Sequence, residues 1–342
     1  MFSNPFLSSP ESLTNCNQSF GMTSKKSKIL ILGFGTVGQG FFDLFTKKKE
    51  MLGLNNFSIS EIVDMKFGHI TNPTKDLVGE LAKGKTFEQK DVISTIKESD
   101  ADIVCEFTWL NLKTAEPAYT HIKTALDMGK HVITTNKGPP ALMYKELTSL
   151  AQKRGVKFLM KGTVMAGTPS FNLLELLPGA EVKSVRGIMN GTTNYILTSM
   201  EQGKNFSTAL KEAQELGYAE ADPTNDVDGF DSASKITIVS HILGWRHEFG
   251  DLKIEGIRNV TPEQARDKTK LVAYADRSTA YVRPIKLSRE DVLSGVSGVM
   301  NAIELDTDTM GKIYSMGPGA GKIQTAQAAL TDLVTIMKSQ KL

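Results

Sequence analysis

The sequence is poor in cysteine, and its two cysteines, Cys16 and Cys105, cannot form a disulfide framework. Cys105 lies inside an apolar run that is typical of a strand. Both observations favour a reducing compartment, and we expect a cytoplasmic protein.

Long apolar runs are also absent, since none approaches the roughly 18 residues that a membrane-spanning helix needs. The first 27 residues have neither the apolar core of a secretion signal nor the arginines of a transit peptide. Their content of Ser, Asn, Thr and Pro indicates a loosely attached extension over 1–27. We do not expect the protein to bind a membrane.

An excess of either charge is missing, because 40 basic residues balance 38 acidic ones to a net charge of +2. This balance gives no reason to expect nucleic acid as a partner. The five histidines are scattered, and none stands at metal-ligand spacing with a cysteine or carboxylate, so a zinc site is not expected. What is present is an ordinary globular composition over 342 residues, which is enough for two domains.

A glycine-rich turn follows the first apolar run at 28–32. It reads GFGTVG over 33–38 and leads into a helical pattern with one apolar side. A strand, G-x-G-x-x-G and a helix in this order are the context of a dinucleotide-binding fingerprint. Gly33 permits the tight turn, Gly35 lets the backbone approach a pyrophosphate, and Gly38 lets the helix pack closely on the strand. The N-terminus of the helix would bind the phosphates.

The second expected strand, 57–63, is followed by Asp64 and then by Lys66. An acid at this position commonly binds the ribose 2′-hydroxyl of NAD, whereas a nearby cation accommodates the extra phosphate of NADP. Because both are present, the choice between NAD and NADP stays open. Lys66 is also compatible with a solvated residue at a strand end.

Strands and helices alternate through the first half of the chain, which predicts a mostly parallel, doubly wound sheet of the Rossmann type. After residue 160 the alternation is lost, and an α+β second domain with a mixed or antiparallel sheet is expected. A final helix beyond 317–321 has one apolar side, which we expect to bury on the nucleotide domain. We therefore predict a dinucleotide-binding domain of 28–160 with 318–342, and a substrate-binding and dimerisation domain of 161–317. The expected strands are 28–32, 57–63, 102–107, 131–135, 156–160, 182–189, 281–285 and 299–305.

Ligands of such sheets bind beyond the carboxyl ends of the strands, so the residues that follow a strand are candidates for a site. Lys137 follows the strand at 131–135, although a solvated loop lysine is the more common outcome for this position alone. After residue 160, a glycine-rich loop leads into a helix for which Thr168 is the expected N-cap and Pro169 the expected first residue.

Five acidic residues crowd the turn-rich stretch that leads into a helix within 217–235. On that helix Asp231 and Lys235 are four residues apart and share a face. Such a pair is often a solvated ion pair of little energetic value. Ile238 and Ile242 continue the same stripe, however, so the face also points toward protein. A lysine in a partly dry cleft beside carboxylates can be tuned for proton transfer.

Together these segments resemble the homoserine dehydrogenase family from about Lys28 to the C-terminus. The motifs that carry the resemblance are GFGTVG at 33–38, TTNKGP at 134–139, NGTTNYIL at 190–197, GYAEADPTNDVDGFDSASK at 217–235 and GPGAG at 317–321. The resemblance implies NAD- or NADP-dependent interconversion of L-homoserine and L-aspartate 4-semialdehyde, on the pathway to threonine and methionine. It also implies a homodimer.

The resemblance assigns roles to particular residues. Lys235 is the expected proton donor and acceptor at the substrate oxygen, and Lys137 is the second expected catalytic residue. The residues expected to bind the substrate are Glu220, Asp226, Asp231, Gly191 and Thr192. Together with the fingerprint at 33–38 and the acid after the second strand, the resemblance gives the residues expected to contact the cofactor, which are Gly33, Phe34, Gly35, Thr36, Val37, Gly38, Asp64, Thr108, Lys137 and Gly319. A lysine suits this chemistry because hydride transfer to a carbonyl leaves alkoxide charge that it can stabilise and protonate.

One position departs from the family pattern. Many members have a glutamate where this chain has Lys161, and that glutamate helps backbone carbonyls to hold a monovalent cation such as sodium. The carbonyls at matching positions are those of Val164, Ala166 and Thr168. Because a lysine cannot ligate sodium, we expect its ammonium to take the place of the ion and activity to depend less on sodium or potassium.

Two other classes of function stay open. A related two-domain NAD(P)-dependent oxidoreductase that acts on another amino acid or semialdehyde would keep the fingerprint, but its reaction would not require both Lys137 and Lys235. A non-catalytic cofactor-binding protein would be expected to lose one of these lysines. The chain ends soon after the last helix, so inhibition by threonine through a regulatory extension is not expected.

Overall fold

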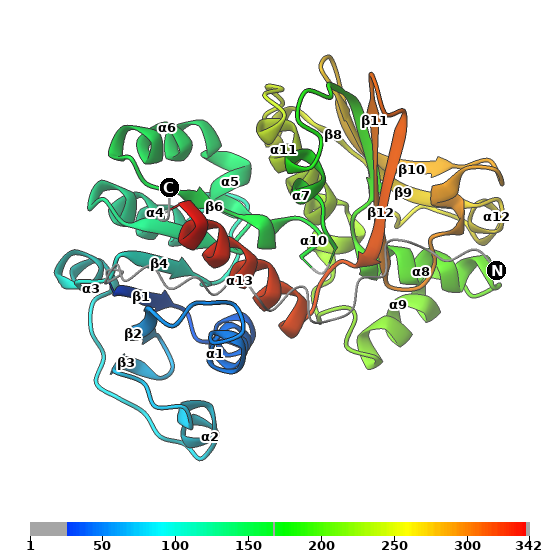
Figure 1. The fold of residues 1–342 in the computed structure, drawn as a ribbon. Coiled ribbons are helices and arrows are strands. Elements are labelled where there is room, and N and C mark those ends of the chain that lie inside the picture. Colours follow the sequence, from blue (N-terminus) through cyan, green and yellow to red (C-terminus); the bar gives the residue numbers. More distant parts are fainter. Residues whose placement is uncertain (1–25, 167, 340–342) are drawn as a thin grey trace, which may run out of the picture.

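The computed structural model describes residues 26–166 and 168–339, and in these ranges the chain forms two six-stranded sheets, each with its own helices (Figure 1). Cys16 and nearly all of the extension expected at 1–27 lie outside the described residues, and Ser27 begins the first strand. Within the described ranges, no helix combines the length and apolar character that a membrane crossing requires.

The first sheet has the order β3-β2-β1-β4-β5-β6, and its neighbours are parallel except for β2 and β3. Its strands are β1 (Ser27–Leu32), β2 (Phe57–Asp64), β3 (Gly68–Thr71), β4 (Ile103–Glu106), β5 (His131–Thr134) and β6 (Phe158–Leu159). Its helices are α1 (Thr36–Lys48), α2 (Leu77–Ala82), α3 (Val92–Glu98), α4 (Ala118–Asp127), α5 (Gly138–Leu142), α6 (Tyr144–Arg154) and α13 (Lys322–Ser339). The predicted doubly wound sheet is confirmed, with β3 as an additional antiparallel edge strand.

Residues of the central strands alternate between two buried faces. Ile29 and Ile31 of β1 pack with apolar residues of α1 and α13, whereas Leu30 and Leu32 belong to the cluster that includes α4. Burial on both faces explains why β1 reads as a continuous apolar run. The last helix therefore lies on the first sheet, although the whole second sheet comes between them in the sequence (Figure 1).

The second sheet has the order β12-β11-β7-β9-β10-β8, with antiparallel neighbours except for β10 and β8. Its strands are β7 (Val182–Ile188), β8 (Lys253–Ile254), β9 (Thr269–Asp276), β10 (Ala280–Lys286), β11 (Met300–Thr307) and β12 (Lys312–Pro318). Its α-helices are α7 (Phe171–Glu175), α8 (Gly191–Glu201), α9 (Phe206–Glu215), α10 (Thr224–Val227), α11 (Phe230–Ile242) and α12 (Pro262–Arg266). The 3₁₀ helices are η2 (Lys161–Thr163), η3 (Phe249–Asp251) and η4 (Val292–Gly295). The mixed sheet expected for this half is confirmed.

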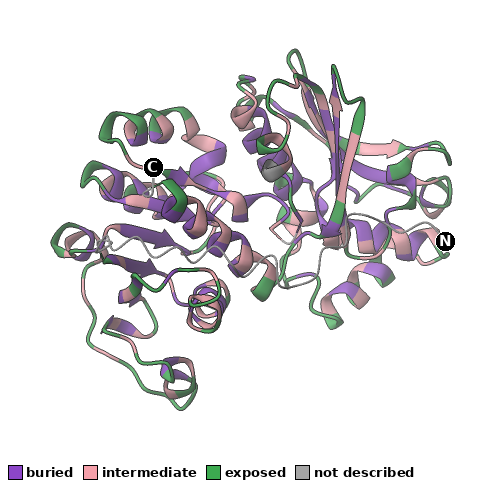
Figure 2. Cartoon of the chain, in the orientation of Figure 1, coloured by how far each residue is buried: buried purple, intermediate pink, exposed green. Residues whose placement is uncertain are grey.

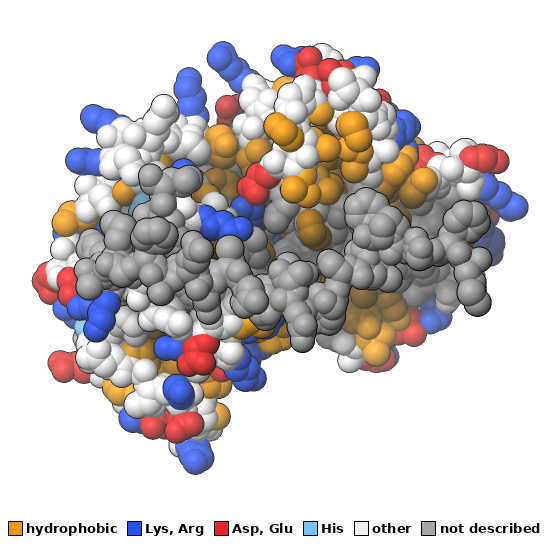
Figure 3. Space-filling model, viewed as in Figure 1, with side chains coloured by type: hydrophobic (Ala, Val, Ile, Leu, Met, Phe, Trp, Pro, Cys, Tyr) orange, Lys and Arg blue, Asp and Glu red, His pale blue; other side chains and the backbone are white. Residues whose placement is uncertain are grey.

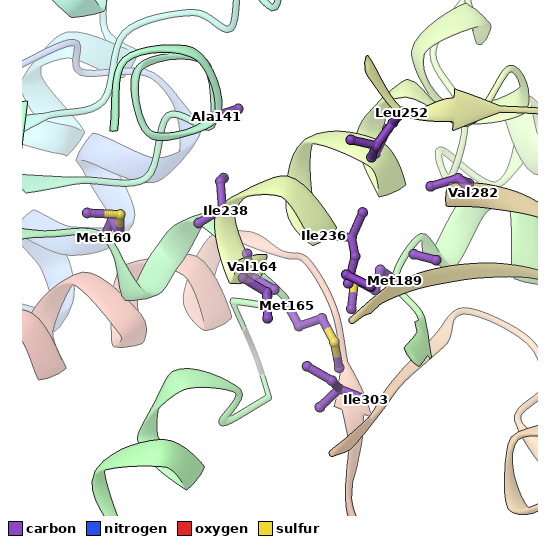
Figure 4. Close-up of a cluster of buried hydrophobic side chains, with 14 of the residues drawn as sticks. Ala141, Met160, Val164, Met165, Met189, Ile236, Ile238, Leu252, Val282 and Ile303 are labelled. Carbon is purple, nitrogen blue, oxygen red and sulfur yellow. The ribbon is translucent and has the colours of Figure 1, made fainter. Parts of the chain in front are cut away.

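Helix α11 connects the two halves. It packs against β9 and β10 of the second sheet and also against α5 and α6 of the first half. Every residue from Asp231 to Ser240 is buried. The strands at the centre of the first sheet are likewise coloured as buried in Figure 2. Ile238 lies on the side of Ala141, while Ile236 lies toward Leu252 and Val282 (Figure 4). One hydrophobic core therefore continues from the first half into the second through this helix.

The loop after β6 differs from the prediction. Helix α7 begins at Phe171, so Thr168 is not its N-cap and Pro169 is not its first residue. Instead, the Thr168 hydroxyl donates to the carbonyl of Pro318 at 3.2 Å. The side chain that would cap a local helix is used to fasten this loop to the end of β12, a contact that local sequence does not encode.

Candidate active site

One cavity of about 670 Å³ is lined from both halves of the chain. The predicted site residues that line it are Val37, Thr108, Lys137, Ala166, Gly191, Thr192, Glu220, Asp226, Asp231, Lys235 and Gly319. The first three come from the first half, and most of the others come from α8, α10, α11 and the loop before α10. Residues predicted to bind the cofactor and residues predicted to bind the substrate thus line the same cavity, although they are distant in the sequence.

Asp231 and two lysines form an ion-paired group in this cavity. Lys235 Nζ lies 2.6 Å from Asp231 Oδ2 and also donates to the carbonyl of Met189 at 2.6 Å. Lys137 Nζ lies 3.3 Å from the other carboxylate oxygen, Asp231 Oδ1. The side chains of Lys235 and Asp231 are only 8% and 11% exposed, which excludes a solvated surface pair.

The two carboxylates of the cavity differ in their electrostatics. Burial alone would raise the pKa of Asp231, but the ammonium groups of Lys235 and Lys137 hold that pKa well below its usual range. For Asp226, burial and then repulsion from Asp231 raise the pKa. A cationic group of a ligand beside Asp226 would offset this repulsion.

Asn190 joins these carboxylates. Its Nδ2 donates to Asp226 Oδ1 at 2.6 Å and to Asp231 Oδ2 at 2.8 Å. Its Oδ1 accepts the N–H of Thr193 at 2.8 Å, which caps α8. Asn190 thus holds the N-terminus of α8 close to the carboxylates of Asp226 and Asp231. The motif at 190–194 led to Gly191 and Thr192 as site residues but not to Asn190.

Glu220 and Thr192 lie toward the outside of the cavity. Glu220 is exposed, and its backbone carbonyl accepts a hydrogen bond from the side chain of Gln214 at 3.1 Å. The Thr192 hydroxyl donates to the carbonyl of Tyr218 at 2.6 Å, which holds the loop that carries Glu220 against α8. This loop therefore forms an acidic rim around the deeper carboxylates.

The opposite wall comes from the ends of β4 and β5. Glu106, fully buried at the end of β4, accepts hydrogen bonds from the N–H of Thr108 at 3.0 Å and from its hydroxyl. Asn136 Nδ2 donates to the carbonyl of Thr108 at 3.2 Å, and Asn136 Oδ1 accepts the N–H of Gly138 at 3.0 Å. These bonds hold the two strand ends together and place Lys137 opposite α11.

The fingerprint turn has the geometry that a dinucleotide requires. Gly33 has a φ of 84°, and a Cβ there would lie 2.7 Å from the carbonyl oxygen of Phe107. A Cβ on Gly38 would lie 2.3 Å from the carbonyl oxygen of Gly33, so α1 packs closely on this turn. Gly35 is the N-cap of α1 without a side-chain cap, and no atom lies within 4 Å of the position of its Cβ. The first turn of α1 is therefore accessible to a pyrophosphate.

The remaining cofactor residues surround this turn. Phe34 is fully buried, and its N–H donates to Asp64 Oδ2 at 2.7 Å, so only its backbone is available at the surface of the turn. Thr36 is exposed at the start of α1. A second cavity of about 390 Å³ lies here, and Gly33, Gly35, Asp64 and Thr108 are the predicted residues that line it.

The loop that matches the monovalent-cation site of many family members carries the ammonium group of Lys161, as its sequence indicates. Lys161 Nζ lies 2.8 Å from Glu175 Oε1 and 3.7 Å from Asp332 Oδ1. The Val164 carbonyl accepts the hydroxyl of Ser170 at 3.1 Å. The residues present therefore do not fit a metal cation beside this ammonium. Across residues 26–166 and 168–339, no group of three or more His, Cys, Asp or Glu side chains could hold a metal ion.

The chain is similar to known proteins over nearly its whole length. Residues 33–161 match the family described as "Homoserine dehydrogenase, NAD binding domain", and residues 169–334 match "Homoserine dehydrogenase". The chain is 42% identical to a homoserine dehydrogenase of Sulfurisphaera tokodaii, over 91% of this chain and 99% of the relative. It is 34% identical to an NAD(+)-dependent homoserine dehydrogenase of Pseudomonas canavaninivorans, over 91% and 96% of the two chains.

Solved structures agree with these relatives. An Archaeoglobus fulgidus protein assigned as a homoserine dehydrogenase has a TM-score of 0.84 and 36% identity, over 91% of this chain and 99% of that one. A hyperthermophilic archaeal homoserine dehydrogenase in complex with NADPH has a TM-score of 0.81 and 30% identity, over 92% and 98% of the two chains.

Proposed function

Since the chain belongs to the homoserine dehydrogenase family, which interconverts L-homoserine and L-aspartate 4-semialdehyde with NAD(P), we propose how its own residues carry out that reaction. The protein is an NAD(P)-dependent oxidoreductase that acts on a small molecule in threonine and methionine biosynthesis. One observation carries the proposal: buried Lys235 and Asp231 and half-buried Lys137 share a cavity with Val37, at the start of the fingerprint helix.

The cofactor is proposed to lie along the fingerprint turn and to reach into the larger cavity. The backbone of 33–38 binds the pyrophosphate at the N-terminus of α1. Thr108 and Gly319 line the same cavity as Lys235, which supports a role for them in orienting the nicotinamide toward the substrate carbon. When bound, the nicotinamide supplies or accepts the hydride.

Lys235 is proposed to move the proton at the substrate oxygen. Its ammonium is fixed by Asp231 and by the carbonyl of Met189. Hydride addition to the aldehyde carbon leaves negative charge on oxygen, which Lys235 stabilises and protonates. In the oxidation of homoserine, the same nitrogen acts as the neutral amine and takes the hydroxyl proton, which restores the ammonium group. Lys137 lies beside the other carboxylate oxygen of Asp231. Its ammonium group adds a second positive charge near the substrate oxygen.

The amino-acid end of the substrate is proposed to bind between the acidic residues and α8. Glu220 and Asp226 offer carboxylates to the α-ammonium group. Gly191 and Thr192 form the first turn of α8, where the end of the helix favours a carboxylate. Asn190 bridges Asp226 and Asp231 and so keeps both carboxylates in fixed positions.

The test is the change in nicotinamide absorbance when the protein is mixed with L-homoserine and either NAD⁺ or NADP⁺. We expect turnover with at least one of them. Lys235→Ala should lower kcat by roughly 100-fold or more, because general acid–base catalysis is lost. Lys211→Ala, which removes a 78% exposed lysine from α9, is the control. Absence of turnover with both cofactors would contradict the reaction, whereas near-normal kcat in Lys235→Ala would contradict only the role of this lysine.

We further propose a homodimer formed through the second sheet. Helices α8, α11 and α12 pack on one face of this sheet. The register places one row of side chains across the opposite face, and these are Tyr314, Glu304, Arg186, Tyr274 and Tyr281. The three tyrosines are half-buried, and Met316 beside them is 47% exposed. Figure 3 shows hydrophobic side chains gathered over β11 and β12. Apolar, aromatic surfaces of this kind are typical of subunit interfaces.

The domain limits and the compartment are part of the same proposal. The position of α13 on the first sheet supports a dinucleotide-binding domain of 28–160 with 318–342, and the second sheet supports a substrate-binding and dimerisation domain of 161–317. A cytoplasmic location is supported by Cys105, a free and buried thiol whose pKa burial raises.

A further inference from the structure

We infer that Asp64 makes this chain select NAD over NADP. The inference rests on the proposed function, because it concerns the cofactor of that same reaction. Gly33, Gly35 and Asp64 line a cavity of about 390 Å³ beside the fingerprint turn. In a doubly wound sheet the adenosine ribose lies near the end of the second strand, and Asp64 is the last residue of β2.

Three backbone N–H groups hold the Asp64 carboxylate in place. Its Oδ2 accepts the N–H of Phe34 at 2.7 Å, and its Oδ1 accepts those of Lys66 at 2.8 Å and Phe67 at 3.1 Å. Phe34 belongs to the fingerprint turn, so the carboxylate is tied to the loop that receives the pyrophosphate. Because a carboxylate oxygen has two acceptor sites, Oδ2 retains one for a ribose hydroxyl. A carboxylate accepts hydrogen bonds from a diol but has none to donate to a phosphate.

The lining offers no strong cation for the additional phosphate of NADP. Among the described residues that line this cavity, only Asp64 and His121 have ionisable side chains. His121 is buried, and its Nδ1 lies 3.9 Å from the carboxylate of fully buried Glu106. Lys66 does not line the cavity, and its ammonium lies 5.3 Å from the ring centre of Phe67. The phosphate would therefore meet a fixed carboxylate and neither a guanidinium nor an ammonium group in the lining.

The sign of the effect follows from these charges. The 2′-phosphate brings negative charge close to Asp64, at a protein wall that screens charges less than bulk water does. This repulsion weakens NADP binding and leaves NAD unaffected. The ribose hydroxyl of NAD instead gains a hydrogen bond to a charged acceptor, which is stronger than one to a neutral acceptor. The same side chain thus favours one cofactor and disfavours the other.

The first experiment measures the binding of NADH and NADPH to the whole wild-type chain by titration calorimetry, together with kcat/KM for NAD⁺ and NADP⁺ at saturating L-homoserine. NADH should bind at least about tenfold more tightly than NADPH, as expected for one charge repulsion exchanged for one charged hydrogen bond. NADPH binding as tight as NADH binding would overturn the inference even if the enzyme turns over. Selective NADH binding without turnover would support the inference and contradict the proposed reaction.

The second experiment compares matched variants by the same calorimetry. Asp64→Ser should reduce the preference for NADH roughly tenfold, and Asp64→Asn, which keeps the shape and an acceptor for Phe34, replaces it if the serine variant fails to fold. Asp76→Ser removes an exposed carboxylate outside the cavity, and Lys66→Ala removes the neighbouring lysine. Both controls should leave the ratio of the two affinities unchanged. An unchanged ratio in a folded Asp64 variant, or loss of NADPH binding in Lys66→Ala, would overturn the inference.

Discussion

Asp231 sets the balance of charge in the active site. Its two oxygens serve separate lysines, with Lys235 on Oδ2 and Lys137 on Oδ1. Asn190 adds a neutral donor to Oδ2 and connects it to Asp226. Two ammonium groups therefore face two carboxylates before any ligand binds, and each lysine keeps a fixed position. The arrangement favours a substrate that brings both an ammonium group and a carbonyl oxygen.

Asp226→Asn is predicted to weaken substrate binding more than catalysis. Burial and the charge of Asp231 raise the pKa of Asp226, so the proposed contact with the substrate's ammonium group would stabilise the charged form of this carboxylate. Removing its charge should raise KM for L-homoserine roughly tenfold with a much smaller change in kcat, as expected for one charged hydrogen bond. Steady-state kinetics with saturating cofactor measure both constants.

The control for this variant is Asp222→Asn, an exposed acid in the same loop, which should leave both constants unchanged. A fall in kcat at unchanged KM in Asp226→Asn would show that the residue acts on the chemical step instead.

Some site residues were predictable because their relation is local. Asp231 and Lys235 share a helix face, and helical spacing alone brings them together. Asn190 contacts Asp226 and Asp231, which follow it by 36 and 41 residues, so no local pattern reveals its role. An asparagine before a helix predicts an N-cap, and Asn190 is that cap as well. Because the role of Asn190 as an N-cap already accounts for its residue type, the sequence gives no separate signal for its contacts with the two distant carboxylates.

At the scale of elements, α13 fastens the chain where it passes from the first sheet to the second. Asp332 of α13 is fully buried, and its Oδ2 accepts the N–H of Lys161, the first residue of η2, at 2.9 Å. The Lys161 ammonium is shared between Glu175 and Asp332. The last helix thus holds η2 near the wall of the cavity, which Gly162 and Thr163 help to form.

Asp332 is predicted to make stability depend on pH. Although Lys161 lies nearby, complete burial raises the pKa of Asp332 from its usual 3.8 to about 7. The folded protein therefore binds this proton more tightly than the unfolded chain does. The resulting stabilisation is fully present below pH 4 and is lost as pH rises to about 7. Asp332→Asn cannot titrate there and still accepts the N–H of Lys161, so the free energy of unfolding of the wild type, relative to this variant, should fall by about 1–3 kcal/mol between pH 5 and pH 8.

Urea denaturation of both proteins at several pH values measures this difference. Asp127→Asn, which removes an exposed carboxylate from α4, should run parallel to the wild type. A constant difference between wild type and Asp332→Asn from pH 5 to pH 8 would contradict the raised pKa.

Elements were predictable where the sequence period is strong and less so where the chain is exposed or interrupted. The central strands of the first sheet are buried on both faces and read as apolar runs. β12 is only partly buried at a sheet edge and ends in Gly317-Pro318, so its pattern does not predict a strand. The helical segment between β5 and β6 is divided into α5 and α6, because the backbone leaves the helical conformation at Met143.

At the scale of the whole molecule, the site exists only because distant segments cross between the halves. The fingerprint turn and the ends of β4 and β5 supply one wall, while α8, α10 and α11 supply the other. Helix α11 carries Lys235 and packs on both halves, so the lysine is held by the core rather than by a loop. This rigidity suits the proposed role of Lys235 as a proton donor beside a cofactor that the first half would mainly bind.

Met316→Arg is predicted to convert the proposed dimer into monomers. Met316 is 47% exposed on the face of the second sheet that carries the row of tyrosines. In a two-fold interface one substitution places two unpaired guanidinium groups in a desolvated surface, which should weaken association by at least about tenfold. Light scattering coupled to size exclusion should give twice the chain mass of 37.4 kDa for the wild type and a shift toward that mass for the variant at micromolar concentration.

Met128→Arg is the matched control, because Met128 has a similar exposure of 48% but lies at the end of α4 in the first half. It introduces the same charge on a surface that the proposed interface does not use, so it should remain a dimer. A wild-type chain that is monomeric at micromolar concentration would contradict the dimer itself. Equal dissociation of both variants would instead show that the sheet face is not the contact, since the added charge would then act wherever it is placed.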